Sequence, residues 1–161
     1  MSDQTIQTVV PGKMVPDFSA PATNGVFSLS EHRGKALVLY FYPRNNTPVC
    51  TKQSLLFRDH FEEFEKIGAT VAGVSRDSIK SHELFARKFD LPFTLLSDTD
   101  EHICNLFNVL KIKKNYGRIV HGIERSTFLI DPSGRLVKEW RGIKVDGHID
   151  ELLDAIRNIS A

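Results

Sequence analysis

The chain carries one long apolar run, Ala36-Leu37-Val38-Leu39-Tyr40-Phe41-Tyr42, bounded by Gly34 and Pro43. Continuous apolarity over a segment of this length, between turn-forming residues, is typical of a strand buried on both faces of a sheet. At seven residues, the run is far shorter than the roughly 20 that a membrane-spanning helix needs. The sequence therefore predicts the central strand of a layered α/β domain and no membrane partner.

The apolar spacing changes directly after this run. Residues 43–48 form a polar loop rich in turn-forming residues, and after it apolar side chains recur every three to four positions. This period predicts a helix that begins near Pro48 and ends at Gly68. The same reasoning predicts strands over 26–29, 70–74 and 91–96, and helices that end near residues 89, 107 and 159.

Two further strands are predicted to form a hairpin. Segments 126–130 and 136–140 flank Asp131-Pro132-Ser133-Gly134, whose residue types favour a turn. Strands and helices alternate before this hairpin, which predicts an α/β sheet with an antiparallel edge. No repeat or linker interrupts the pattern. We therefore expect a single domain over residues 1–161, with residues 1–12 as a loosely ordered N-terminal arm.

The composition limits the classes of function. The chain has 161 residues, of which 41% are hydrophobic and 25% are charged, as in globular proteins. Its 21 Lys and Arg against 20 Asp and Glu leave a net charge of +1, which argues against nucleic acid or an anionic membrane as the main partner. The first residues lack the apolar core of a secretory signal, and two cysteines are too few for a disulfide scaffold, so we expect a cytoplasmic protein.

Cys50 lies where a helix is predicted to follow a strand and a loop. The first turn of a helix presents unpaired N–H groups and the positive end of the helix dipole, and both favour an anion. In such positions thiols become reactive thiolates. The carboxyl end of a central strand is also where α/β folds bind their ligands. Cys50 is therefore the candidate nucleophile, with a buried, inert cysteine as the alternative.

The residues around Cys50 match a family signature. The segment Pro43-Arg44-Asn45-Asn46-Thr47-Pro48-Val49-Cys50 resembles the Pro-x-x-x-Thr-x-x-Cys active-site signature of peroxiredoxins, in the AhpC/TSA superfamily. Residues 40–43, 46–48, 73–78 and 124–131 are most similar to its bacterioferritin-comigratory, or Q-type, branch. The resemblance runs from about Val15 to the C-terminal helix, which is nearly the whole chain.

This resemblance implies a thioredoxin-like α/β fold with a central mixed β-sheet flanked by helices. It also implies a thiol-specific peroxidase, an oxidoreductase that reduces hydrogen peroxide and organic hydroperoxides through a cysteine sulfenic acid and serves antioxidant defence. Thioredoxin or a similar thiol donor would recycle this enzyme. No bound cofactor is implied, and a monomer is expected.

Four residues receive roles from the resemblance. Cys50 would be the peroxidatic nucleophile, Thr47 and Arg125 its partners, and Pro43 a shield against bulk water. Breaking an O–O bond needs a thiolate in line and donors that stabilise charge on both oxygens. Arg125 offers a permanent charge and several fixed donors, and the Thr47 hydroxyl can both accept and donate. The backbone N–H groups of Val49 and Cys50 would complete the cradle.

Each partner also has a simpler interpretation. Thr47 could be only a helix cap, Arg125 a surface residue at a strand start, and Pro43 a strand terminator. Two positions depart from the branch pattern. Val49 replaces a usual glycine, which changes access to the nucleophile, and Gln53 replaces a frequent glutamate, so a carboxylate near the helix start is missing.

The role of the second cysteine, Cys104, is open at this point. Many relatives of this branch carry a resolving cysteine five residues after the nucleophile, where this chain has Leu55, or around residues 84–88, where it has none. Cys104 is the remaining candidate resolving cysteine, but its apolar neighbours favour a packed, unreactive thiol. A resolving role needs the two Cα atoms within about 7 Å of each other, after local unfolding. Otherwise an external thiol must reduce the sulfenic acid.

Other classes of function find less support. The six histidines show no metal-ligand spacing, so no metal site is expected, and the glycine motifs of nucleotide binding are absent. Two rival functions stay open. One is a cysteine hydrolase that pairs Cys50 with a histidine such as His121, and the other is a non-catalytic thioredoxin-fold interaction or chaperone module.

Overall fold

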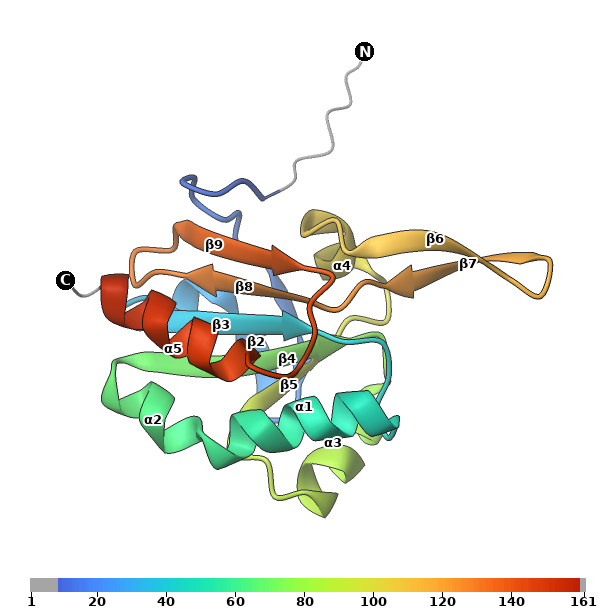
Figure 1. The fold of residues 1–161 in the computed structure, drawn as a ribbon, viewed down its shortest axis with the longest axis horizontal. Coiled ribbons are helices and arrows are strands. Elements are labelled where there is room, and N and C mark those ends of the chain that lie inside the picture. Colours follow the sequence, from blue (N-terminus) through green and yellow to red (C-terminus); the bar gives the residue numbers. More distant parts are fainter. Residues whose placement is uncertain (1–8, 160–161) are drawn as a thin grey trace, which may run out of the picture.

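A computed structural model describes residues 9–159, with the backbone alone for residues 113–115. A seven-stranded sheet runs through its centre in the order β2-β1-β5-β4-β3-β8-β9 (Figure 1). Strands β3, β4 and β5 are parallel, whereas β8, β9, β1 and β2 join by antiparallel pairing. The predicted mixed sheet is confirmed. Its strands are β1 (Ser19–Ala22), β2 (Gly25–Ser28), β3 (Ala36–Phe41), β4 (Ala69–Ser75), β5 (Thr94–Ser97), β8 (Ser126–Ile130) and β9 (Leu136–Arg141).

The predicted central strand is β3, and every one of its residues is buried. Side chains alternate between the two faces of a strand, so Tyr40 joins one hydrophobic core and Leu39 the other. The Tyr40 face packs against α1 (Pro48–Asp59), α2 (Phe61–Lys66), α3 (Ile79–Lys88) and α5 (His148–Ile159). The Leu39 face packs against α4 (His102–Leu106) and the segment before β1, near the short helix η1 (Leu29–His32).

The helix predicted up to Gly68 is interrupted at His60, which separates α1 from α2. His60 leaves the helical region with φ −107° and ψ 8°, while its backbone N–H and its ring Nδ1 both contact the carbonyl oxygen of Leu56. The apolar period continues through both helices because they cover the same face of the sheet. The period therefore predicted the buried face correctly and missed the break.

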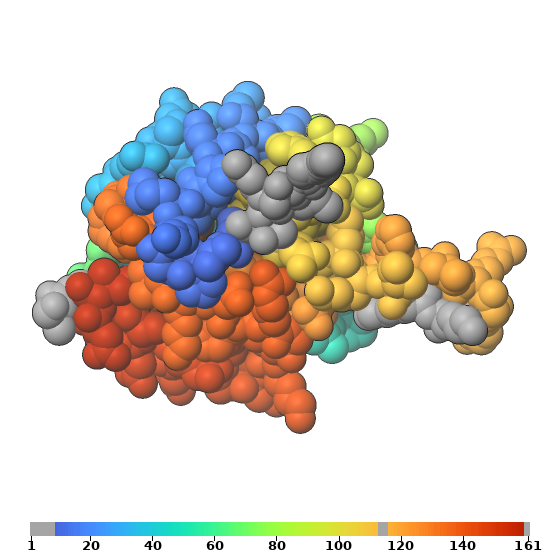
Figure 2. All heavy atoms as spheres, turned by 90° about the horizontal axis from the view of Figure 1, so that it is seen from above, coloured from blue at the N-terminus to red at the C-terminus, as the bar shows by residue number. Residues whose placement is uncertain are grey.

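Three strands were not predicted from the sequence. They are β1 and the antiparallel pair β6 (Leu110–Asn115) and β7 (Arg118–Ile123), which forms a separate two-stranded sheet. This hairpin stands out from the body in both views (Figures 1 and 2). Its two-residue turn, Tyr116-Gly117, has positive φ angles of 52° and 75°, as the tight turns that join two strands require.

The N-terminal segment is attached to the body from residue 9 onward. Val9 is buried and its N–H donates to the carbonyl of Leu106, while the Gly12 N–H donates to Leu136. Of the predicted loose arm over residues 1–12, residues 1–8 lie outside the described residues. Residues 9–12 are attached to the body by these backbone hydrogen bonds. No helix in the described part of the chain is long and apolar enough to cross a membrane.

Candidate active site

Cys50 lies in the first turn of α1, just beyond the carboxyl end of β3. Pro48 occupies the start of the helix, where its missing N–H costs no hydrogen bond. The first hydrogen bond of this turn runs from the N–H of Thr51 to the carbonyl of Thr47. The N–H groups of Val49 and Cys50 precede it and have no helical acceptor. Cys50 itself is only 1% exposed, so its sulfur lies at the open end of a helix and away from bulk water.

Arg125 lies against the sulfur of Cys50, although 75 positions separate the two residues in the sequence. Strand β8 begins at Ser126, which pairs with Phe41 at the end of β3. Because these strands are antiparallel, the residue before β8 lies at the same edge as the loop after β3. The Nη2 of Arg125 donates to the Sγ of Cys50 over 3.3 Å. The structure therefore brings a permanent positive charge to the predicted nucleophile.

Gln53 holds the other arm of the same guanidinium. Its Oε1 accepts a hydrogen bond of 2.6 Å from the Nη1 of Arg125. The sequence indicates only that Gln53 replaces a frequent glutamate, and it does not predict this contact. The amide oxygen supplies the acceptor without a negative charge beside the thiol. The other polar atom of this amide, Nε2, is buried and has no hydrogen-bond partner. Within the part of the chain that the structure describes, it is the one buried side-chain nitrogen or oxygen in this state.

Thr47 occupies the cap position of α1, but its side chain does not cap the helix. Its Oγ1 instead donates to the carbonyl oxygen of Arg44 over 3.0 Å. The interpretation of Thr47 as only a helix cap is therefore wrong for its hydroxyl. This arrangement leaves the N–H groups of the first turn free of a capping side chain, at the end of the helix where an anion is favoured.

The loop that follows Pro43 is held by a polar network around Asn45. Pro43 is exposed and directly follows the last residues of the buried run. Asn45 accepts from the Tyr42 hydroxyl over 2.7 Å, its Nδ2 lies 3.0 Å from the Nδ1 of His82, and its backbone N–H donates to Asp77. Burial lowers the pKa of His82, and the negative charge of Asp77 opposes this effect in part. A neutral His82 with an unprotonated Nδ1 fits the amide donor of Asn45.

Tyr40 forms the inner wall beside the helix of Cys50. Its hydroxyl lies 3.0 Å from the Oγ of Ser54, and its ring stacks on Phe57 with a centroid distance of 4.4 Å. Burial raises the pKa of Tyr40 and keeps it neutral. Gly73 lies beside this ring on the adjacent strand β4, and a Cβ there would lie 2.8 Å from the Tyr40 Cζ. A glycine is required at this position because the ring occupies the space of its side chain.

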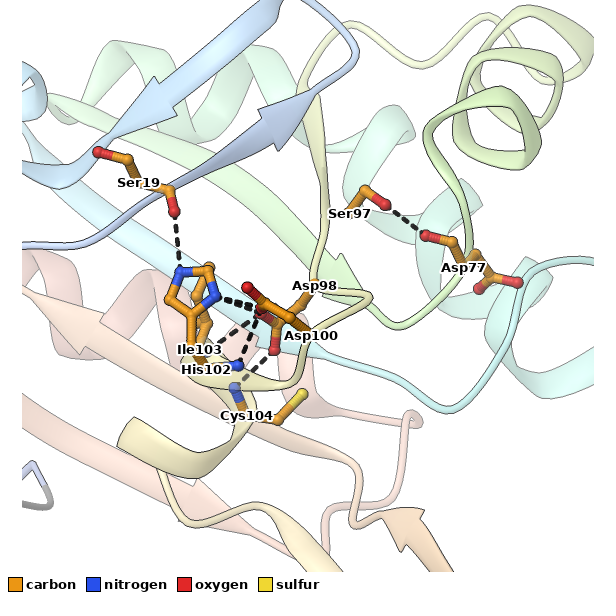
Figure 3. Close-up of polar contacts among 8 residues, drawn as sticks. All are labelled: Ser19, Asp77, Ser97, Asp98, Asp100, His102, Ile103 and Cys104. Atoms are coloured by element: carbon orange, nitrogen blue, oxygen red, sulfur yellow. Dashed lines mark hydrogen bonds and ion pairs between the residues drawn. The ribbon is translucent and has the colours of Figure 1, made fainter. Parts of the chain in front are cut away.

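Cys104 occupies a different environment from Cys50, and its backbone N–H donates to the carboxylate of Asp98 (Figure 3). It belongs to the core on the Leu39 face of the sheet, whereas Cys50 belongs to the core on the Tyr40 face. Burial raises the pKa of the Cys104 thiol, and the negative charge of Asp98 raises it further. The structure does not bring the nucleophile and its candidate resolving cysteine together.

Three residues near Cys104 gather oxygen and nitrogen atoms that could hold a metal. They are Asp98, Asp100 and His102, whose ligand atoms lie within 4.8 Å of one another. Each already has a partner: Asp98 accepts from the N–H groups of Ile103 and Cys104, and His102 contacts both Asp100 and the Ser19 carbonyl (Figure 3). This cluster is explained by helix capping and an ion pair, and we assign it no metal.

His121 does not support a cysteine hydrolase. It lies on β7 with an exposed side chain, and its carbonyl oxygen accepts from Arg76. Among residues 9–159, the hydrogen-bond partner of the Cys50 sulfur is Arg125 and not a histidine. The general base that such a hydrolase needs is therefore not at the nucleophile.

Comparison with known proteins gives the site a family. Residues 11–139 match the model of the AhpC/TSA family. The chain is 45% identical to Peroxiredoxin Bcp of Bacillus subtilis over 154 residues, which cover 95% of this chain and 98% of that protein. It is 50% identical to Peroxiredoxin Bcp of Xanthomonas campestris over 130 residues, which cover 81% of this chain and 81% of that protein.

Two solved structures share the fold and part of the sequence. Bacterioferritin Comigratory Protein of Xanthomonas campestris, studied for alkyl peroxide reduction, superposes with a TM-score of 0.85 at 45% identity, covering 89% of this chain and 92% of the other. Peroxidoxin BcpB of Mycobacterium tuberculosis superposes with a TM-score of 0.83 at 30% identity, over 95% and 99% of the two chains. The chain described here belongs to the AhpC/TSA family and is a peroxiredoxin of the Bcp, or Q, type.

Proposed function

We propose that this peroxidase uses Cys50 as its peroxidatic cysteine on hydrogen peroxide and organic hydroperoxides. The observation that carries this assignment is the 3.3 Å contact between the Arg125 guanidinium and the Cys50 sulfur. A fixed cation beside a thiol favours the thiolate, which is the nucleophilic form. The same guanidinium has further donors for the peroxide oxygens.

The reaction follows from these groups. The Cys50 thiolate attacks one oxygen of the hydroperoxide, so an S–O bond forms while the O–O bond breaks. The sulfur is oxidised to a sulfenic acid, and the departing oxygen takes a proton to leave as water or alcohol. Arg125 and the free N–H groups of the α1 first turn stabilise the charge that develops on the oxygens. In this proposal the Thr47 hydroxyl orients the peroxide and Pro43 shields the site.

An external thiol is proposed to complete the cycle. The separation of Cys50 and Cys104 by the sheet supports this route, because a disulfide between them needs their Cα atoms within about 7 Å of each other. Thioredoxin or a similar thiol donor would then reduce the sulfenic acid directly. A monomer in a reducing, cytoplasmic compartment belongs to the same proposal.

Mass spectrometry after one equivalent of hydrogen peroxide tests this function. We expect a mass increase of one oxygen on the peptide that contains Cys50, trapped with a sulfenic acid reagent, and an unmodified Cys104. A Cys50–Cys104 disulfide would retain the peroxidase and replace the external route by an internal one. A protein that consumes no peroxide and gains no oxygen at Cys50 would refute the proposal.

A further inference from the structure

The hairpin of β6 and β7 projects from the body of the molecule and exposes large side chains (Figures 1 and 2). Its two strands pair with each other, and among the described residues no further strand pairs with either of them. Ile112, Tyr116 and Ile119 are 71%, 99% and 67% exposed. Tyr116 lies in the turn at the tip, and the two isoleucines lie on the strands on either side of it. A narrow ribbon therefore holds apolar and aromatic surface in water.

The strand register places the two isoleucines on one face of this ribbon. In an antiparallel pair, residues directly opposite each other share a face, and so do residues two positions apart on one strand. Leu110 pairs with Ile123. Ile112 pairs with His121, and Ile119 lies two positions before His121. At the base of the hairpin this face belongs to the hydrophobic core, in which Ile123 is buried and against which Leu110 packs. The exposed isoleucines thus extend a core-forming face out into solvent.

The charge of the hairpin has one sign. Between Glu101 and Glu124 no residue is acidic and four are basic, namely Lys111, Lys113, Lys114 and Arg118. By the same register, Lys111 and Arg118 lie on the face opposite to the isoleucines. Glu101, near the base, is already paired with Arg76 over 2.9 Å. The net charge of +1, which argued against an anionic membrane as the main partner, is an average over the whole chain and does not describe this ribbon.

The base of the hairpin is fixed at the edge of the sheet where the candidate nucleophile lies. Strand β7 ends at Ile123, two residues before Arg125, and the guanidinium of Arg125 contacts the sulfur of Cys50. The carbonyl oxygen of His121 accepts a hydrogen bond of 3.0 Å from Arg76. A surface that binds the hairpin therefore also lies close to this edge of the sheet.

An anionic lipid surface fits this combination of side chains. Basic residues are attracted to anionic headgroups, apolar side chains enter the boundary with the acyl chains, and tyrosine rings lie at the headgroup level. The unpaired backbone groups at the edges of the ribbon stay hydrated at that depth. Nucleic acid would match the charge but leave the isoleucines in water. A stable protein interface buries about 800 Å² on each partner over a broad patch, whereas a projecting tip fits a soft surface that it can enter.

We propose that the β6–β7 hairpin binds an anionic lipid surface and inserts its tip among the headgroups. Ile112, Tyr116 and Ile119 supply the apolar and aromatic contact, and Lys111 and Arg118 meet the lipid phosphates. Because the ribbon enters tip first, both of its faces lie among the headgroups. This inference goes beyond the proposed function and does not depend on it, since the hairpin contains none of the groups assigned to peroxide chemistry.

Co-sedimentation with lipid vesicles tests the proposal. We expect the wild-type protein to bind vesicles of equal parts phosphatidylcholine and phosphatidylglycerol at low salt, and to bind phosphatidylcholine alone much more weakly. Lys111→Glu combined with Arg118→Glu should lower the partition coefficient on the anionic vesicles by about 25-fold or more, from about fivefold for each basic residue lost. Ile112→Ser combined with Ile119→Ser should lower it by about tenfold, because apolar burial is lost.

Two pairs of substitutions outside the hairpin are the matched controls. Lys80→Glu with Arg157→Glu makes the same change in net charge at exposed positions on α3 and α5. Val26→Ser with Leu84→Ser removes two apolar side chains that are 65% and 53% exposed. Urea unfolding verifies that each variant is folded. The proposal is overturned when a control pair lowers vesicle binding as much as the corresponding pair in the hairpin.

Tryptophan fluorescence follows the tip separately. Tyr116→Trp adds an indole at the turn, and the wild-type protein, whose one tryptophan is Trp140, supplies the background. We expect the added emission to shift to the blue on anionic vesicles and to be quenched by brominated lipid. Bound protein with an unshifted emission would refute insertion of the tip.

The remaining outcomes separate the lipid surface from other partners. A wild-type protein that does not bind the vesicles, but binds duplex DNA or polyglutamate through Lys111 and Arg118, would refute the lipid assignment. None of these measurements uses peroxide. A protein that gains no oxygen at Cys50 would therefore refute the proposed function and leave the result for the hairpin unchanged.

Discussion

The two cysteines are equally buried, yet they have opposite electrostatic environments. Cys50 is 1% exposed and Cys104 is 0% exposed, and each lies near the start of a helix. The sulfur of Cys50 accepts from the guanidinium of Arg125. The thiol of Cys104 is buried beside the carboxylate of Asp98, and both burial and this charge raise its pKa. Burial alone therefore does not distinguish the two thiols, whereas the charge of the neighbouring side chain does.

The helix starts differ in the same way. At α4, the Asp98 carboxylate accepts from the N–H groups of Ile103 and Cys104 at 3.1 and 2.7 Å (Figure 3). At α1, no side chain caps the helix. The anion that a helix start favours is thus supplied by the protein at Cys104, whereas no side chain supplies one at the start of α1.

Replacement of each cysteine by serine gives the largest expected difference between the two regions. Cys50→Ser should lower the rate of peroxide consumption by more than about a thousandfold, because a neutral hydroxyl replaces the thiolate nucleophile. The rate for Cys104→Ser should stay within about twofold of the wild-type rate, since the Cys104 thiol is expected to contribute only to packing. Peroxide consumption with a thiol donor measures both variants. A strong loss in Cys104→Ser would show that Cys104 resolves the sulfenic acid.

Removal of the cation comes next in size. Arg125→Ala should slow the oxidation of Cys50 by about 10²–10³, as the loss of a fixed donor to a developing anion does elsewhere. Arg125→Lys keeps the charge but loses the paired donors, so its oxidation rate should lie between those of the wild type and Arg125→Ala. Arg157→Ala, an exposed arginine on α5, is the control. Stopped-flow oxidation by hydrogen peroxide gives the rates, and equal rates in Arg125→Ala and wild type would contradict the comparison.

Gln53 should act on Cys50 through Arg125, as a positioning residue. Gln53→Leu removes the acceptor at 2.6 Å and should slow oxidation by about tenfold, because a misplaced catalytic group costs rate. Gln53→Glu restores an acceptor, so most of the rate should return. Rates and melting temperatures are measured together. A rate that falls only in step with stability, with no recovery in Gln53→Glu, would show a purely structural role.

The carboxylate at the other cysteine should affect stability and leave peroxide chemistry unchanged. Asp98→Asn weakens the cap of α4 and should lower the free energy of unfolding by about 1 kcal/mol, within the range of capping residues. Urea unfolding measures this loss. The rate of Cys50 oxidation should not change, because the sheet separates the two sites. An equal loss of oxidation rate would mean that the two regions are coupled.

The smallest expected effect is a pH dependence of stability from His82, which contacts Asn45 in the loop before the helix of Cys50. Burial lowers the pKa of His82 in the folded protein below its ordinary value of 6.5. The unfolded chain therefore binds more protons below about pH 6.5, so stability falls as the pH falls through this range. His82→Gln should reduce that loss between pH 7.5 and 5.5, as followed by urea unfolding. An unchanged pH slope in the variant would exclude His82 as its source.

The sequence predicted most of the central layer. The strand over 36–42, the helix start before Cys50 and the hairpin around residues 131–134 are confirmed, because each has a strong local pattern. The break at His60 and the hairpin β6–β7 were missed. The first depends on one backbone torsion inside a continuous apolar period. The second projects from the body and lacks the alternation of buried and exposed residues that reveals a strand, since its exposed side includes Ile112 and Ile119.

The candidate site divides in the same way. The signature around Cys50 predicted the nucleophile, and the family resemblance predicted Arg125 as its partner, which the structure places against the Cys50 sulfur. The hydrogen bond of Gln53 and the network around Asn45 were not predicted. Helix period and turn composition are local properties, but these contacts join residues between 32 and 72 positions apart. No local pattern encodes which side chains will meet across such distances.

By itself the sequence determined the local position of Cys50, the predicted nucleophile, at a helix start that follows a buried strand. Local propensity decides this, because the apolar run, the proline and the helical period act within about twenty neighbouring residues. Only the tertiary structure decided what faces each sulfur. The antiparallel register of β8 against β3 delivers Arg125 to Cys50, and the alternation of side chains across the sheet separates Cys104 from it. Both follow from strand pairing, which fixes partners through backbone hydrogen bonds between distant segments.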